Sequence, residues 1–389
     1  MSVKPKEAVM PNRRTILQLF ALGSLATVPA VSAANRSDTD PAAAWRNPGA
    51  GQKDPRLYSL AHAILAPNPH NRQPWLVSLE GEDSIILYFD TTRRLPATDP
   101  YDRQLAIGCG AFLEILSIAA REIGYDAQTN LFPAGEPQPL LNDKPLAHIR
   151  LVKGGSKDPL YSFITQRRSN KEAYDAKKRV SAESLQALLA VEPTETLTLS
   201  GTLSGNPQCE ALRQLSIQAY RQEIQTPVAL KESIDLMRIG KAEIAKYRDG
   251  IDLDFPGIGA MQAIGLLTRE KMMTPGTKAY QQGLEQYDPL AKSASGYVWM
   301  ISNSKDRFAE IAVGRAYARL NLRATALGIA IHPMSQALQE YAEMSALKAD
   351  AEQAVGLSSD SRLQMLARIG YARQVPPSPR RGLEEHIRT

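Results

Sequence analysis

The chain has 389 residues, 43% of them hydrophobic and 22% charged, with a formal net charge of +5. This length exceeds what one hydrophobic core usually fills, so we expect two domains or two fused halves. Three of the five net positive charges lie in the first 33 residues. No basic cluster with interleaved aromatic residues follows, which excludes a nucleic-acid-binding protein.

Two cysteines and five histidines are present, and none of them has the spacing of metal ligands, so we expect no metal site. A disulfide between Cys109 and Cys209 is chemically possible in an oxidising compartment. Two buried free thiols are the favoured alternative.

The N-terminal segment has the pattern of a twin-arginine export signal. Arg13 and Arg14 precede an apolar run over 17–28, and Val31-Ser32-Ala33 supply a small-residue cleavage site. A membrane anchor is the alternative, but the run is short, and no later stretch is expected to span a bilayer. The sequence therefore predicts a signal peptide over 1–33, recognition by the twin-arginine export machinery, a periplasmic location and no stable membrane insertion. This pathway carries folded proteins, which indicates a bound cofactor.

The first half of the mature chain begins after a flexible linker, expected over 34–53 from its Pro, Gly and Asn content. Asp54 caps the first helix, with Pro55 at its first position. Hydrophobic periodicity then predicts, in chain order, a helix over 55–65, a hairpin of strands 76–79 and 85–89, a long buried helix over 104–123 and a strand over 148–152.

The second half contains a stretch over 226–296 that is mostly helical and has no counterpart in the first half. Around this stretch the periodicity predicts a helix over 161–168, a helix capped by Ser181, a strand over 196–202, a helix over 306–327, a loop over 333–336, a strand over 365–370 and an extended basic tail over 376–381.

An internal repeat relates the two long helices. Gly110 to Gly124 and Gly314 to Gly328 have the same spacing, and apolar residues match between them at the same offset. Strand-like segments follow both helices. We therefore expect two related halves, 54–155 and 156–389, packed as a single-chain pseudo-dimer around one continuous core.

The stretch Ala66-Pro-Asn-Pro-His-Asn-Arg-Gln-Pro-Trp75 carries three prolines, which exclude a helix interior. It also presents the side-chain amides of Asn68, Asn71 and Gln73, which can bind a planar polar ligand. For this stretch alone, the favoured interpretation is a proline-stiffened turn whose amides bond their own backbone.

A basic motif, Arg167-Arg168-Ser169-Asn170-Lys171, follows the helix predicted over 161–168. Arginine guanidinium groups match phosphate oxygens, and a serine hydroxyl adds a donor. A solvated helix end is the alternative. Arg380 and Arg381 could complete a phosphate site or belong to a charged tail. No P-loop, no G-x-G-x-x-G after a strand and no G-x-S-x-G is present.

Together, the loop ending in Gln73-Pro74-Trp75 and the motif 167–171 resemble the nitroreductase-like FMN flavoproteins. Their order along the chain resembles the Acg-type branch, in which two nitroreductase-like halves are fused. The resemblance covers about residues 54 to 388. It implies an α+β fold with two halves, each an antiparallel sheet flanked by helices, and FMN as the cofactor.

The resemblance also implies the roles of individual residues. Arg167, Arg168 and Ser169 would hold the FMN phosphate, assisted by Arg380 and Arg381. Lys171 would lie at the flavin N1–O2 edge and stabilise the negative charge of reduced flavin. The flavin would also be lined by two loops, whose residues are Pro67, Asn68, Asn71 and Gln73 from the first half and Pro333, Met334, Ser335 and Gln336 along the N5 edge.

The expected function is an FMN-dependent oxidoreductase of the nitroreductase type, with one FMN per chain. It would transfer a hydride through flavin N5 from a small-molecule donor to a nitroaromatic, quinone or similar acceptor, without a certain catalytic side chain. Asn68-Pro69 departs from the family's hydroxyl pair, and 226–296 is either a lid over the flavin or a packing excursion. The alternatives are a flavin-binding protein without turnover and an interaction module without cofactor. The chain would be a monomer or a homodimer.

Overall fold

The computed structural model describes residues 40–190 and 196–388. The predicted signal peptide over 1–33 lies outside the described residues. The helices in this part of the chain are α2 (Pro55–Ala63), α3 (Arg103–Glu122), α4 (Ala182–Leu189), α5 (Pro207–Gln225), α6 (Pro227–Asp235), α7 (Gly240–Tyr247), α8 (Ile258–Ala263), α9 (Arg269–Met273), α10 (Lys278–Glu285), α11 (Tyr287–Lys292), α12 (Arg307–Ala326) and α13 (Ser345–Ala354).

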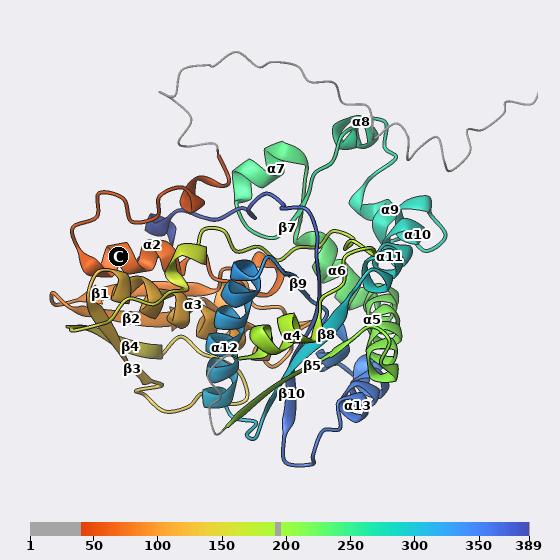
Figure 1. The fold of residues 1–389 in the computed structure, drawn as a ribbon. Helices are drawn as coiled ribbons and strands as arrows, with labels where there is room; N and C mark the ends of the chain where they lie inside the picture. The colour runs from red at the N-terminus through yellow and green to blue at the C-terminus, as the bar shows by residue number, and fades with distance from the viewer. Residues whose placement is uncertain (1–39, 191–195, 389) are drawn as a thin grey trace, which may run out of the picture. The chain divides into compact units, whose positions relative to one another are not determined.

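Two four-stranded antiparallel sheets and the helices around them form an α+β fold, as predicted (Figure 1). The first sheet has the order β1-β2-β4-β3 and the second the order β5-β8-β10-β9. Their strands are β1 (Trp75–Glu80), β2 (Ser84–Phe89), β3 (Tyr125–Leu131), β4 (Pro145–Lys153), β5 (Leu197–Leu203), β8 (Gly296–Ser302), β9 (Ala330–Pro333) and β10 (Arg362–Gly370).

Several predicted elements are confirmed. Asp54 caps α2 by accepting a hydrogen bond from the Arg56 N–H, and Ser181 caps α4 in the same way. β1 and β2 pair as the predicted hairpin, and the strands predicted within 148–152 and 365–370 lie inside β4 and β10. These elements share strong local signals, namely a capping side chain or a short apolar run between turn residues.

The two long helices α3 and α12 cross each other at a pair of glycines. A Cβ atom on Gly110 would lie 2.2 Å from the carbonyl oxygen of Ile311, and one on Gly314 would lie 2.0 Å from that of Ile107. The contact is reciprocal, because each glycine meets the carbonyl oxygen of the isoleucine three residues before the other glycine. Only glycine allows the backbones to approach so closely.

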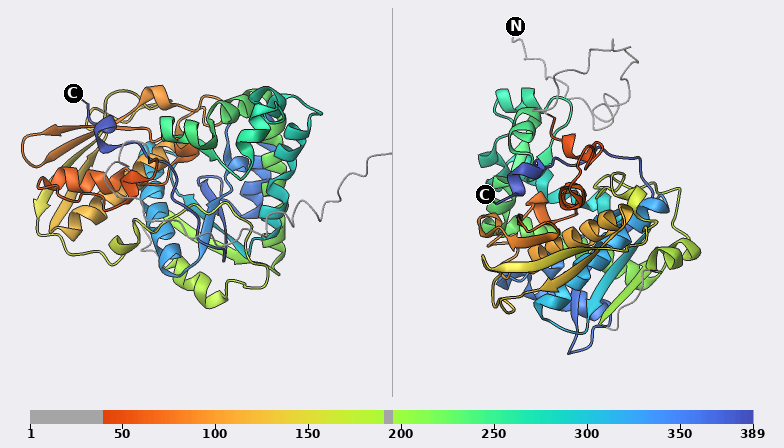
Figure 2. Two further views of the ribbon diagram at one scale, coloured as in Figure 1. Left: turned by 90° about the horizontal axis from the view of Figure 1, so that it is seen from above. Right: turned by 90° about the vertical axis from the view of Figure 1, so that its left-hand side faces the viewer.

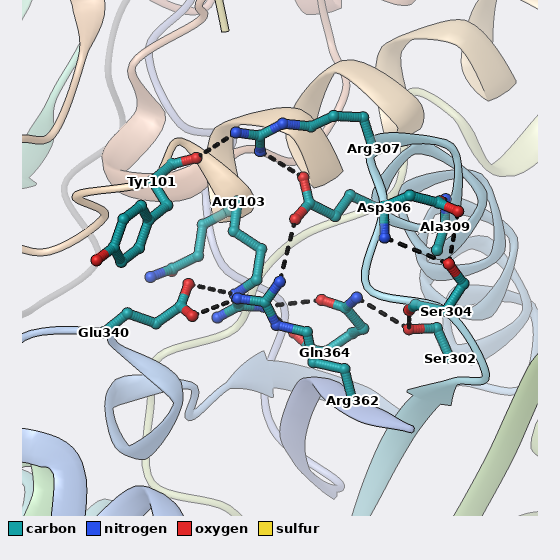
Figure 3. Close-up of polar contacts among 12 residues, drawn as sticks. Tyr101, Arg103, Ser302, Ser304, Asp306, Arg307, Ala309, Glu340, Arg362 and Gln364 are labelled. Carbon is teal, nitrogen blue, oxygen red and sulfur yellow. Dashed lines mark hydrogen bonds and ion pairs between the residues drawn. The ribbon is translucent and has the colours of Figure 1, made fainter. Parts of the chain in front are cut away.

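Each long helix begins with an arginine, Arg103 in α3 and Arg307 in α12 (Figure 3). Both side chains bond to residues that are distant in the sequence. Arg103 donates to the carbonyl oxygens of Leu338 and Gln364, both at 2.8 Å. Arg307 donates to those of Tyr101 and Pro139, both at 2.7 Å. The carboxylates that pair with this arginine group, which also includes Arg362, are Glu310 and Glu340.

The stretch 226–296 is mostly helical, as predicted, and carries α6 to α11. It also contains a short parallel pair of strands, β6 (Met237–Ile239) and β7 (Ile251–Leu253). In Figures 1 and 2 this stretch is the green to cyan part of the ribbon. Residues after β10 return to the first sheet, where the Arg388 N–H donates to the Val77 carbonyl at 2.7 Å.

Two expectations about local structure were wrong. Residues 161–168 form only a short 3-10 turn, η4 (Tyr161–Phe163), because the chain leaves the helix to reach β9, where the Asn170 N–H donates to the Ile331 carbonyl at 3.0 Å. The described part of the expected linker, 40–53, is also structured. It contains the 3-10 helix η1 (Ala43–Trp45), and Trp45 is buried in the core.

Cys109 and Cys209 are buried free thiols, in separate hydrophobic clusters. This confirms the favoured alternative. By length and composition, α3 could cross a bilayer, contrary to the expectation for stretches after the signal peptide. Most of it is buried inside the protein, as expected for a central core helix.

Candidate functional site

Three of the predicted phosphate-binding arginines gather around one tryptophan. The guanidinium carbons of Arg168, Arg380 and Arg167 lie 4.9, 5.2 and 5.4 Å from the centre of the Trp45 ring. These distances are typical of cation–π contacts. The chain thus brings residues from its beginning, middle and end to one point.

Backbone carbonyls hold the guanidinium groups of this cluster. Arg167 and Arg380 donate to the carbonyls of residues 64–66, at distances of 2.8 to 3.4 Å, where α2 ends. The carbonyls at a helix C-terminus lack partners within the helix and attract cations. Arg168 donates to the Thr165 carbonyl at 2.8 Å. These bonds fix the cations without neutralising them.

Within the described residues, no carboxylate forms an ion pair with Arg167, Arg168 or Arg380. Burial lowers the pKa of Arg167 to about 10 and holds that of Arg380 well below its ordinary value, and the neighbouring arginines lower both further. The charge of Asp252 partly offsets this lowering of the Arg380 pKa. The cluster therefore keeps a buried net positive charge, which favours an anion.

The loop over 66–75 is held in a strained conformation beside this cluster. His70, Asn71 and Gln73 have positive φ angles of 47°, 51° and 51°. Non-glycine residues rarely adopt this left-handed region, and such strain is concentrated at functional sites. A hydrogen bond of 2.7 Å from the Gln73 N–H to Asn68 Oδ1 closes the loop. Pro67 is buried at its start.

The C-terminal tail binds this loop through both predicted arginines. Asn71 Nδ2 donates to the Pro379 carbonyl at 2.9 Å, and the Arg380 guanidinium donates to Asn71 Oδ1. Arg381 lies apart from the Trp45 cluster. Its guanidinium donates to the Gln73 carbonyl at 2.8 Å and its N–H to Gln73 Oε1 at 3.0 Å, so it supports the loop. The structure thus separates Arg380 from Arg381.

A glycine of α3 lets the loop lie directly on that helix. A Cβ atom on Gly108 would lie 3.1 Å from Asn68 Cβ and 3.3 Å from Pro69 Cδ. Both distances are shorter than ordinary van der Waals contact. The Asn68-Pro69 pair that distinguishes this loop therefore packs on the N-terminal part of α3.

The rest of the basic motif lies between the Trp45 cluster and β9. Ser169 lies beside the hydroxyl of Tyr317, whose pKa burial raises to about 12. Lys171 is exposed and lies near His70 and His332, since its charge contributes to lowering both their pKa values. Burial is the larger cause for both histidines, and it lowers the pKa of His70 to about 4. The buried His70 Nδ1 has no partner within the described residues.

Residues 333–336 lie beside the motif but are largely engaged in the second sheet. The Met334 side chain is fully buried, and its N–H donates to the Leu366 carbonyl at 2.8 Å. Ser335 Oγ donates to the same carbonyl at 3.1 Å. Pro333 is the last residue of β9. The Met334 N–H is therefore engaged in the second sheet, and the contact of 333–336 with the flavin edge stays a prediction.

Gln336, the remaining residue of this predicted loop, faces the stretch 226–296. Its side chain lies against the hydroxyl of Tyr287 on α11, and its buried Oε1 has no partner within the described chain.

A buried aspartate fastens the stretch 226–296 to the loop 66–75. Asp249 pairs with Arg93 and Arg238, both at 2.8 Å, and lies 3.8 Å from Arg72. Backbone bonds lie beside it. The Gly250 N–H donates to the Asn71 carbonyl at 3.2 Å, and Gln73 Nε2 donates to the Arg248 carbonyl at 2.9 Å. We call Asp249 and its three arginines the Asp249 latch.

Sequence reasoning missed Trp45, His70 and the Asp249 latch. Trp45 is one of three tryptophans in the chain and directly follows three alanines. This apolar run was a signal against a flexible linker. His70 falls within the quoted loop but was not assigned a role. Asp249 carried no local signal, because its partners lie elsewhere in the sequence.

A surface cavity of about 740 Å³ lies away from these residues, between α3, α12 and the segment 154–160. Its buried carboxylates, Glu114 and Asp158, each accept a hydrogen bond from Arg319 at 2.8 Å. Opposite charges pair here, whereas the cations around Trp45 have no paired acid in the part of the chain that the structure describes.

The sequence is similar to proteins of Mycobacterium tuberculosis strain H37Rv. One, provisionally named NAD(P)H nitroreductase Rv3131, is 25% identical over 345 residues, which cover 84% of this chain and 89% of the relative. A second, provisionally named NAD(P)H nitroreductase acg, is 38% identical over 71 residues, or 18% of this chain and 21% of the relative. No family model matches the chain.

Solved structures give only distant matches. The FMN-dependent nitroreductase NfnB from Mycobacterium smegmatis in complex with NADPH has 19% identity and a TM-score of 0.35, covering 58% of this chain and 96% of that one. Iodotyrosine deiodinase bound to FMN and 3-iodo-L-tyrosine has 14% identity and a TM-score of 0.35, covering 57% and 95%.

Proposed function

We propose that this protein is an FMN-dependent oxidoreductase of the nitroreductase type. The observation that carries the proposal is the cluster of Arg167, Arg168 and Arg380, which is largely buried and has no paired carboxylate among residues 40–190 and 196–388. A dianionic phosphate monoester is the ligand that such a site favours. The similarity to a provisionally named nitroreductase over 84% of the chain supports the same function.

The residues of the site fit this cofactor. Arg167, Arg168 and Arg380 would hold its phosphate, with Ser169 nearby. The strained loop would line the flavin through Asn68, Asn71 and Gln73. The C-terminal tail orients the amides of Asn71 and Gln73, and the amide of Asn68 is held by bonds within the loop. By the family resemblance, the exposed Lys171 would supply a positive charge at the N1–O2 edge. The buried atoms His70 Nδ1 and Arg381 Nε have no hydrogen-bond partner in the described chain and could bind a ligand.

When bound, FMN supplies two-electron hydride transfer between a reduced donor and an acceptor such as a nitroaromatic or a quinone. The protein's own residues bind, orient and shield the reacting groups. The stretch 226–296, held on the loop by the Asp249 latch, would act as a lid that limits which donors and acceptors enter.

We further propose two nitroreductase-like halves and one phosphate site per chain. The reciprocal crossing at Gly110 and Gly314 supports the related halves. The contrast between the two arginine groups supports the single site. Glu310 and Glu340 pair with the group that contains Arg103 and Arg307, whereas the group around Trp45 has no such acid within the described residues.

A flavin-binding protein without turnover is the second candidate, and the Asp249 latch favours it. A buried carboxylate bound by arginines on both sides of the lid boundary resists opening, because separating such a pair exposes an uncompensated charge. A closed lid would retain the flavin and exclude substrates.

Absorbance of the purified protein tests the main proposal. We expect a flavin spectrum and one FMN per chain. Arg167→Ala should weaken FMN binding by about 1–3 kcal/mol, the contribution of a charge-assisted hydrogen bond. Arg121→Ala, at a half-buried arginine outside the cluster, should not. A colourless protein that cannot be reconstituted, or two flavins per chain, would contradict the proposal. Anaerobic stopped-flow reduction by NADH and NADPH then separates turnover from flavin binding alone.

We also propose export to the periplasm by the twin-arginine machinery, on the basis of Arg13 and Arg14 in the sequence. Replacing both arginines by lysine should leave the protein in the cytoplasm, and cell fractionation would measure this. Unchanged export would refute the assignment.

A further inference from the structure

Trp45 is the shared contact of the three unpaired arginines, although it lies outside every motif that pointed to the site. Only 5% of its surface is exposed. Arg167 and Arg168 come from the segment after η4, and Arg380 comes from the C-terminal tail. No other aromatic ring in the described residues contacts more than one arginine. The ring therefore joins two separate sources of positive charge.

Two hydrogen bonds join the segment that carries the ring to the C-terminal tail. The Trp45 indole N–H donates to the Ser378 carbonyl at 2.8 Å, and the Arg380 N–H donates to the Pro41 carbonyl at 2.9 Å. The segment 41–45 and the tail 378–380 thus hold each other. Because Arg380 belongs to that tail, the position of its guanidinium depends on the position of the ring.

The choice of an aromatic partner has a chemical consequence. A tryptophan face attracts guanidinium groups and limits their mutual repulsion, but it carries no formal charge. A carboxylate in the same place would neutralise the cluster, as Glu310 and Glu340 do for Arg103, Arg307 and Arg362. An aromatic ring therefore gathers the cations and leaves their charge available to an anion.

We propose that Trp45 is a positioning residue of a phosphate-monoester site, and that it holds Arg167, Arg168 and Arg380 together for the phosphate of the cofactor. The proposal rests on the proposed function for the identity of that cofactor. It adds a residue of the segment 40–53 to the site. The ring acts through the arginines, so its effect should depend on whether the ligand carries a phosphate.

The test compares FMN with riboflavin, which lacks the phosphate, in Trp45→Leu and Trp45→Phe proteins. Titration should give FMN binding about tenfold weaker for Trp45→Leu, consistent with loss of cation–π contacts. Riboflavin binding should be unchanged. Trp45→Phe keeps an aromatic face and should retain most of the FMN affinity. Trp299→Phe, which alters a buried tryptophan of β8, is the matched control.

Three results would overturn the inference. These are equal loss of FMN and riboflavin affinity in Trp45→Leu, unchanged FMN affinity in that variant, and tighter FMN binding, which would mean that the ring blocks the site. The thermal unfolding of each variant identifies misfolding. If Trp45→Leu does not fold, Trp45→Gln, which also removes the aromatic face, carries the same comparison of FMN with riboflavin.

A flavin-free measurement separates this inference from the proposed function. Inorganic phosphate should raise the unfolding temperature of the wild-type protein and not that of Trp45→Leu. If the wild type binds neither flavin but shows this difference, the FMN proposal fails and the phosphate site stands. If phosphate stabilises both proteins equally, or neither, the role of Trp45 is refuted.

Discussion

Replacing Gly110 by alanine would insert a methyl group where α3 and α12 cross. Its Cβ would lie 2.2 Å from the Ile311 carbonyl oxygen and 3.0 Å from Gly314 Cα. Both are backbone atoms, which cannot rotate away as a side chain does, so the helices must separate. Overpacking of a core typically costs about 1–3 kcal/mol, and we expect a value near the top of that range.

Urea unfolding followed by circular dichroism measures this loss as a lower midpoint. Gly283→Ala is the control, because Gly283 lies within α10 and an added Cβ there meets nothing within 4 Å. That substitution should stabilise the protein by about 0.5–1 kcal/mol through helix propensity.

The reciprocal contact adds a sharper expectation. Gly314→Ala should destabilise the protein to a similar extent, because its Cβ would lie 2.0 Å from the Ile107 carbonyl oxygen. The double variant should lose less than the sum of the two single losses, since the first substitution already separates the helices. Equal midpoints for Gly110→Ala and wild type, or fully additive losses, would refute the crossing as described.

Three further outcomes are expected. Asp249→Asn should destabilise the protein by about 3–5 kcal/mol, since it breaks buried ion pairs, and should accelerate proteolysis within 236–275. Asp235→Asn, at an exposed aspartate, is the control, and equal proteolysis rates in the two variants would contradict the latch. Burial lowers the pKa of His386 to about 3 from 6.5, so the folded protein favours the neutral imidazole and its stability should fall as the pH drops from 6.5 towards 3. The urea midpoint should depend less on pH in His386→Phe than in the wild type. The same pH dependence in both proteins would contradict this role of His386. Burial raises the pKa of Cys109 to about 12 and also raises that of Cys209. Ellman's reagent should therefore label neither thiol in the native protein and both thiols in denaturant without reductant. Labelling of fewer than two thiols in denaturant would indicate that the cysteines are oxidised.

The elements predicted well from sequence are those with strong local causes. The apolar residues of α3 and the caps Asp54 and Ser181 act over a few positions, so composition and spacing identify them. The helix expected over 161–168 failed because a long-range bond from Asn170 to Ile331 draws the chain away from helical geometry. Local periodicity contains no information about that partner.

The candidate site was predicted in part for the same reason. The resemblance named the loop 66–75 and the arginines, and the structure brings Arg167, Arg168 and Arg380 together. It gave no indication of Trp45, whose indole bonds to Ser378, 333 residues away in sequence. Nor could it distinguish Arg380 from Arg381, since adjacent residues in an extended tail point in different directions.

The arginine cluster also sets an order of assembly for the chain. Its ring comes from residue 45 and one of its cations from residue 380, beyond the last strand of the second sheet. Every strand of both sheets precedes the tail that carries Arg380, because that tail follows β10. The sheets can therefore pair before the arginine cluster is complete. Cofactor capture would then be a late event, possible only once the tail has docked against the start of the domain. Under the proposed function, a bound flavin would report that both ends of the described domain have come together, and the proposed export of a folded protein would require this state.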